Sequence, residues 1–262
     1  MFGNYFYHER IRKSVAMFGK MFNDVYIIRK DASGQVISQV KVPLAYASKQ
    51  KFLERIREQP DTTDQSTAIK LPRMSFEIIA FTYDPQRQLQ KTNKINKSGS
   101  SISVRNKIYS FVPYLISFQL NLYAKTQDDA LQMVEQILPY FSPQYTLTMK
   151  PFVEYPDIVE DVPITIQATS FVDDYEGTVE QRRTIIYTLD FEMKANFYGP
   201  LGSQGIIRQA DANIFNLNEP EVIFEKIRVE PNPINISADS DYGFTETYYG
   251  ALDSAWTIRM VM

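Results

Sequence analysis

Paired carboxylates and a single histidine are the side chains of this sequence most suited to acid–base or metal chemistry. Two adjacent carboxylates can exchange protons with a substrate or hold a divalent cation such as Mg²⁺. The pairs are Asp128-Asp129, Glu160-Asp161 and Asp173-Asp174. Their surroundings favour structural roles, because the first pair opens an expected helix and the others lie in an expected loop and turn. We therefore expect none of these pairs to be catalytic.

The rest of the composition removes further classes of enzyme. The 262 residues include no Cys and one His, which excludes a thiol nucleophile, a disulfide framework and a metal site built on Cys or several His residues. A Ser-His-Asp triad would depend on His8, among aromatic residues near the chain's start. The glycine-rich stretch 199–205 lacks the Lys-Ser/Thr ending of a phosphate loop and is expected to be a turn. We expect no enzyme and no cofactor.

Membrane insertion is not expected either. No apolar run approaches the roughly 20 residues that cross a bilayer, and the first 22 residues carry too many charges for a secretory signal.

Three segments have the apolar spacing of amphipathic helices. Residues 9–22 place Ile11, Val15, Phe18 and Phe22 on one side. Ser48 can cap a second helix that runs to about residue 59, where Pro60 follows. Thr126 begins the third helix with a capping-box-like pattern, and Pro139 ends it.

Alternating apolar and polar residues predict that most of the remaining chain is strand. The clearest examples are 185–195 and 116–122. Shorter candidates are 24–30, 35–42, 74–83, 144–150 and 162–172, with turns at 31–34 and 173–178. Many strands and few helices predict an α+β fold, in which about three helices flank a largely antiparallel sheet.

Two stretches are expected to lie outside this core. Residues 84–107 contain six basic residues and one acidic residue, together with a Ser/Gly tract, and are expected to form a long flexible basic loop. Residues 211–262 are expected to be an extended acidic C-terminal segment, packed on the domain or on a neighbour, whose last residues, 256–262, pair as a strand. The expected division is thus a 1–210 ring-forming domain and a 211–262 segment.

Charge is distributed unevenly along the chain. Residues 1–150 have a net charge of +9, and residues 151–210 and 211–262 each have −6, within a total of −3. Such asymmetry suggests a polyanion contact or a charge-complementary protein contact, or the two regions face each other within one fold. For residues 84–107, a solvated loop, docking to an acidic protein surface and contact with duplex DNA all remain open. The loop lacks aromatic residues for stacking on single-stranded bases.

Several short motifs, taken in order, resemble one family of virion proteins. They are Met1-Phe2-Gly3 with Tyr5-Phe6-Tyr7, Tyr46–Lys49, Leu71–Arg73, Asp128-Asp129 followed by VEQILPYF at 134–141, and Arg182-Arg183 leading to Leu189–Glu192. This pattern, from Met1 to about Arg208, resembles the tail sheath stabiliser, or tail completion, proteins of T-even-like contractile-tailed bacteriophages. The helix-stop-aromatic stretch at 134–141 is its most specific part.

The resemblance implies a structural virion protein with an α+β fold related to tail terminators. It implies a six-fold ring, made in the host cytoplasm, at the head-proximal end of the tail. Such a ring would cap the tube and the last sheath layer, keep the sheath extended and offer a platform to the neck. The implied partners are other copies of the chain, the sheath protein, the tube or its terminator, neck and head-completion proteins, and passing duplex DNA.

The expected interface residues are aromatic or basic. They are Phe2, Tyr5, Tyr7, Arg87, Lys91, Lys94, Lys97, Arg105, Lys107, Arg182, Arg183 and Trp256. The alternative function is a nucleic-acid-binding module that uses residues 84–107.

Overall fold

The computed structural model describes residues 5–31, 33–58, 71–99, 101–175, 183–217, 219–237, 239–250 and 257–261. The chain forms two compact units, each assembled from separate segments. Unit 1 comprises residues 1–6, 89–111 and 198–262, and unit 2 comprises 7–88 and 112–197. The boundary expected at residue 210 stays a prediction, and these units divide the chain at other positions.

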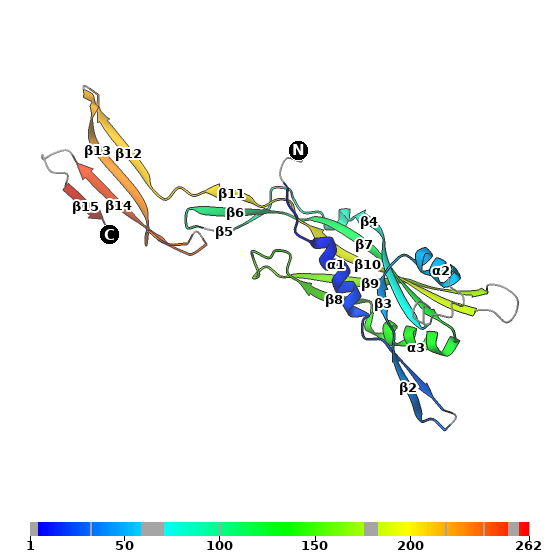
Figure 1. Ribbon diagram of the computed structural model, residues 1–262. Coiled ribbons are helices and arrows are strands. Elements are labelled where there is room, and N and C mark those ends of the chain that lie inside the picture. The colour runs from blue at the N-terminus through cyan, green and yellow to red at the C-terminus, as the bar shows by residue number, and fades with distance from the viewer. Residues whose placement is uncertain are drawn as a thin grey trace. The chain divides into compact units, whose positions relative to one another are not determined.

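Unit 2 contains a six-stranded sheet flanked by three helices, and a separate two-stranded sheet of β1 and β2 (Figure 1). The strand order is β3-β4-β7-β10-β9-β8, in which only the β3–β4 pair is parallel. The helices are α1 (Arg10–Met21), α2 (Lys49–Glu58) and α3 (Gln127–Ile137). The strands are β1 (Tyr26–Lys30), β2 (Val36–Lys41), β3 (Leu44–Tyr46), β4 (Arg73–Tyr83), β7 (Val112–Ala124), β8 (Gln144–Met149), β9 (Glu160–Tyr175) and β10 (Arg183–Phe197), with short 3-10 turns η1 (Pro85–Arg87) and η2 (Leu138–Tyr140).

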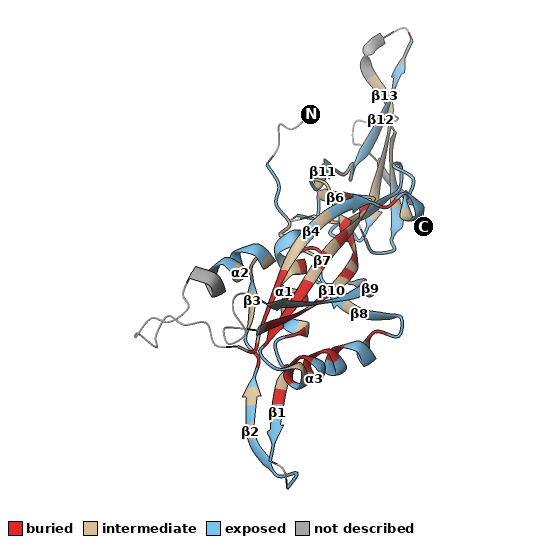
Figure 2. Ribbon diagram, turned by 90° about the vertical axis from the view of Figure 1, so that its right-hand side faces the viewer, coloured by how far each residue is buried: buried red, intermediate tan, exposed pale blue. Residues whose placement is uncertain are grey.

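The core lies between one face of this sheet and the helices α1 and α3. Phe18 of α1 is fully buried and stacks on Phe118 of β7 at a centroid distance of 4.3 Å. Gly19 allows this close approach, because a Cβ there would lie 3.0 Å from the ring of Phe76. On the opposite face, α2 buries Phe52 against Tyr123. Figure 2 shows the buried residues along the middle strands of the sheet.

Local signals placed these elements correctly. The three expected helices are confirmed, and Thr126 accepts a hydrogen bond from the backbone N–H of Asp129 at the start of α3. The expected strands are confirmed as β1, β2, β4, β7, β8, β9 and β10. The turn at 31–34 joins β1 to β2, with Gly34 in a left-handed conformation, φ 79°. The turn expected at 173–178 does not begin at Asp173, because residues 173–175 belong to β9 and pair with β10, and residues 176–182 lie outside the described range.

Unit 1 holds two antiparallel sheets, with strand orders β11-β6-β5 and β12-β13-β14-β15. Their strands are β5 (Lys94–Ser98), β6 (Val104–Tyr109), β11 (Gly202–Gly205), β12 (Ala210–Asn216), β13 (Glu219–Asn232), β14 (Gly243–Gly250) and β15 (Thr257–Val261). The expected terminal strand is confirmed as β15, which pairs with β14.

Three sequence-based expectations are corrected in unit 1. Residues 84–107 are not one long loop, because the cross-strand pair Ile95–Ile108 helps to hold β5 and β6 together as a hairpin, and Ile108 is buried. The stretch 199–205 is not only a turn, since β11 adds to β6. The region after residue 211 is a sheet rather than an extended segment. The strand β5 is mostly polar and β11 pairs with a strand far away in the sequence, so alternation of apolar residues did not reveal these two pairings.

Candidate interaction surfaces

The carboxylates that suggested chemistry are engaged in structural contacts. Asp129 binds Arg29 of β1 at 2.8 Å, and its neighbour Asp128 accepts from Gln132. Asp161 accepts from Thr148, while the side chains of Asp173 and Asp174 lie outside the described range. In the part of the chain that is described, no group of three or more His, Cys, Asp or Glu residues has metal-binding geometry.

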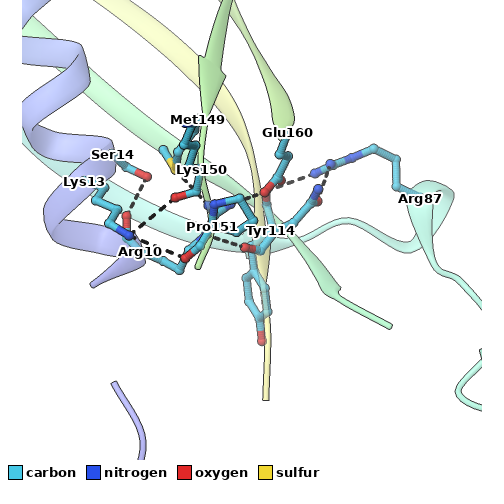
Figure 3. A network of polar contacts seen from close by, with 10 residues as sticks. Arg10, Lys13, Ser14, Arg87, Tyr114, Met149, Lys150, Pro151 and Glu160 are labelled. Atoms are coloured by element: carbon cyan, nitrogen blue, oxygen red, sulfur yellow. Dashed lines mark hydrogen bonds and ion pairs between the residues drawn. The ribbon is translucent and has the colours of Figure 1, made fainter. Parts of the chain in front are cut away.

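Glu160, the remaining carboxylate, is the centre of a buried ionic network in unit 2. Its Oε2 lies 2.6 Å from Nη2 of Arg10, and the two side chains are only 9% and 5% exposed. Arg10 also donates to the carbonyl of Asn196 at 2.9 Å. Burial raises the pKa of Glu160, an effect that the Arg10 charge opposes. Figure 3 shows Glu160 of β9 between Arg10 of α1 and Arg87 of η1.

Arg87 is part of this interior network rather than of an open basic surface. It donates to Asp84 at 2.6 Å, to the side chain of Asn196 at 2.9 Å and to the carbonyl of Tyr114 at 3.1 Å. The hydrogen bond from Arg87 lowers the pKa of Asp84. Asp84 in turn caps η1 through the N–H of Gln86. These bonds fix the turn that leaves β4, so Arg87 has a structural role here.

The other basic residues of 84–107 lie in unit 1. Lys91 and Lys94 are exposed, and Lys97, Arg105 and Lys107 are half-buried. The β5–β6 register places Lys94, Arg105 and Lys107 on one face of the hairpin, and Lys97 on the other. Three of the predicted basic residues are thus brought together.

The basic and acidic regions share unit 1. Asp239 accepts hydrogen bonds from the backbone N–H and the hydroxyl of Ser98. Unit 1 contains nine basic and nine acidic residues, and unit 2 contains 19 and 22. The asymmetry along the sequence is therefore balanced within the fold, which favours the intramolecular interpretation of the charge pattern.

The structure describes only some of the other expected interface residues. Tyr5 and Tyr7 are 92% and 59% exposed. His8 makes an edge contact with Phe152 at 5.2 Å. Residues Phe2, Arg182 and Trp256 lie outside the described range, and Arg183 begins β10 with a side chain that is not described.

Two exposed features of unit 2 were missed by the sequence analysis. A hollow of about 480 Å³ lies between α1, α3 and β8, lined by Phe22, Tyr140 and Tyr145 among others. The second half of β4 carries the exposed side chains Ile79, Phe81 and Tyr83. Alternation identified β4 as a strand, but exposure at its edge depends on which strands pair with it.

In the described part of the chain, no helix has the length and apolar character needed to cross a bilayer.

Comparison with known proteins places nearly the whole chain in one family. The sequence profile described as T4-like virus Myoviridae tail sheath stabiliser matches residues 5–253. The chain is also 28% identical over 251 residues to the tail completion protein gp15 of enterobacteria phage T4, which covers 91% of this chain and 90% of that protein. The profile match covers most of both compact units and extends well past Arg208, where the resemblance read from the sequence motifs ended.

Proposed function

Because the chain belongs to the T4-like virus Myoviridae tail sheath stabiliser family, we propose that it forms a six-membered ring at the head-proximal end of a contractile tail. The ring caps the tube and the last sheath layer, keeps the sheath extended and presents a platform for the neck. The single observation that carries this proposal is the family match over residues 5–253, supported by the relative with 28% identity.

The partners in this proposal are other copies of the chain, the tail sheath protein, the tail tube or its terminator, and neck and head-completion proteins. The chain is made in the host cytoplasm and ends in the virion tail. It acts through binding and not catalysis, in line with the structural contacts of Asp129, Glu160 and Asp161. The kinship of its α+β fold with tail-terminator proteins belongs to the same proposal.

The test is complementation of tails assembled without this chain. Purified protein is added to such tails, and extended and contracted or shortened sheaths are counted by negative-stain electron microscopy. The proposal predicts that sheaths stay at full extended length only after addition, and that these tails then join heads. Tails whose sheath length and head joining are unchanged by the protein would overturn the proposal.

Contact with duplex DNA inside the ring is a further part of the proposal, supported by the shared face of Lys94, Arg105 and Lys107. Cations that neutralise phosphates bind duplex DNA without reading its sequence. Binding of the intact chain to duplex DNA is therefore expected to weaken steeply as salt rises, and affinity that is indifferent to salt would remove DNA from the list of partners.

A further inference from the structure

Most of the outer edge of β4 is open. The short strand β3 pairs with β4 only at Met74, Ser75 and Phe76. Within unit 2, no described backbone group pairs with the outer side of β4 from Ile78 to Tyr83. A strand edge of this kind presents a row of free N–H and C=O groups to another strand.

The same sheet has a second open edge at β8. Residues Gln144–Met149 pair with β9 on one side, and no described strand lies on the other. The two open stretches are of similar length, six residues each. They also run in the same direction, because three antiparallel steps between β7, β10, β9 and β8 follow the antiparallel β4–β7 pair.

Neither open stretch carries lysine, proline or an inward-pointing charge, three of the devices that prevent edge-to-edge pairing, and the one irregularity is a bulge in β4 between Ile78 and Ala80, before Phe81. The open part of β4 reads IIAFTY, and the sequence of β8 is QYTLTM. By contrast β5, an edge strand of the sheet in unit 1, carries Lys94 and Lys97. The chain thus places charge on one edge and leaves the open stretches of β4 and β8 in the larger sheet without charge.

One row of directly opposed residues connects the two edges. Across β4, β7, β10, β9 and β8 the row consists of Phe81, Ile116, Met193, Ile164 and Tyr145. The three inner side chains are fully buried, whereas Phe81 and Tyr145 at the ends are 45% and 37% exposed. Opposed residues share a face, so both ends of the row present an aromatic side chain on the core face.

We propose that the β4 edge of one copy pairs in parallel with the β8 edge of the next copy, so that the sheet continues from subunit to subunit. This inference rests on the proposed ring. The contact is heterologous, using different edges on each subunit, and such contacts close into a ring when the rotation fits. In this pairing Phe81 of one copy lies beside Tyr145 of its neighbour. The row of side chains on the core face of the sheet then continues from one subunit into the next.

The absence of cysteine from the chain makes crosslinking a direct test. The double variant Phe81→Cys/Tyr145→Cys is added to tails that lack the protein, and bound material is treated with a short bis-maleimide. We expect a covalent ladder up to the ring size on a denaturing gel. Each single variant should remain monomeric, because a contact between unlike edges needs both cysteines.

The outcomes separate the inference from the proposed function. A double variant that binds tails without forming a ladder overturns the edge pairing and leaves the ring proposal standing. Covalent dimers from either single variant overturn it as well, since they show like edges in contact. Wild-type protein that binds no tails and forms no oligomer in solution overturns both.

A charge placed on the edge supplies an independent test. Ile79→Lys on β4 is compared with Ile37→Lys on β2, because the two side chains are 54% and 67% exposed and each lies at a register shift of its strand pair. We expect Ile79→Lys to abolish assembly on tails and Ile37→Lys to preserve it, with thermal unfolding showing that both variants fold. Normal assembly of the folded Ile79→Lys variant would contradict the inference.

Discussion

The side-chain amide of Gln136 in α3 binds both backbone polar groups of Tyr26 in β1. Nε2 donates to the carbonyl of Tyr26 at 2.7 Å, and Oε1 accepts from its N–H at 3.3 Å. Gln132, one helical turn earlier, makes the same pair of bonds with Ile28, at 3.1 and 3.0 Å. A helix rises about 6 Å over four residues, and a strand advances roughly 6.6 Å over two residues. Side chains four residues apart on a helix can therefore bind the backbone groups of alternate residues along a strand edge.

Removing these amides is expected to loosen the β1–β2 hairpin. A two-stranded hairpin is marginal alone, and each lost hydrogen bond removes about 0.5–1.5 kcal/mol. Gln132→Ala/Gln136→Ala should therefore raise hydrogen exchange in residues 26–30 while the central strand β7 stays protected. Gln39→Ala, an exposed glutamine on β2, is the control. Unchanged exchange in the double variant would show that α3 does not hold this edge.

The Arg10–Glu160 pair should tolerate the loss of one partner poorly. Arg10→Ala leaves a carboxylate that is 9% exposed without its cation, and breaking a buried pair costs about 3–5 kcal/mol. The free energy of unfolding from urea titration should fall by that amount. Arg12→Ala is the control, because its pair with Glu9 is exposed and contributes little. Equal losses in the two variants would contradict a special role for the buried pair.

Glu160 is also expected to make stability depend on pH. Its pKa in the folded chain lies above the ordinary value of 4.5, mainly because of burial. Between 4.5 and the raised value, the folded state binds more protons than the unfolded state, so this contribution to stability is lost as pH rises. The melting temperature of wild type relative to Glu160→Gln should decline through that window. A difference that is flat or grows with pH would contradict the shift.

Lys91 and Lys94 are expected to act in contacts beyond the ring. Lys91→Glu/Lys94→Glu should still bind tails but reduce sheath retention or head joining, because the reversed charges repel an acidic partner. Lys30→Glu/Lys51→Glu changes the net charge equally and is the control. If the lysines contact duplex DNA, the salt dependence of DNA affinity becomes shallower by roughly one unit per lysine lost. Normal virion assembly and unchanged DNA affinity would show that these lysines contact neither a partner protein nor DNA.

Local patterns predicted elements, while pairing between distant segments stayed beyond sequence reasoning. The alternation at 185–195 and 116–122 identified β10 and β7, and the capping pattern at Thr126 located α3. Nothing near Leu44 predicts a parallel partner about thirty residues away, so the short coverage of β4 by β3 was missed. One feature of the sequence could have indicated the network around Glu160. Arg10 lies eight residues before Phe18, and both residues are on the buried side of α1.

The interface residues chosen from the sequence were aromatic or basic. Residue type alone does not show whether a side chain is exposed or already bound within the fold. Arg87 was selected for its charge, yet its guanidinium is partly buried and donates to Asp84, Asn196 and the carbonyl of Tyr114. Phe81 and Tyr145 were not selected, because each reads as an ordinary core position of a strand. Only the register shows that they end one row at the two open edges.

The position of the chain on the virion tests the central claim most directly. Tails assembled with protein carrying a gold-labelled N-terminal tag are imaged by electron microscopy, and the label is located along each tail. The account predicts label at one end only, the end that joins the head, with six-fold end views. Label spread along the sheath, at the opposite end, or absent from intact tails would contradict it.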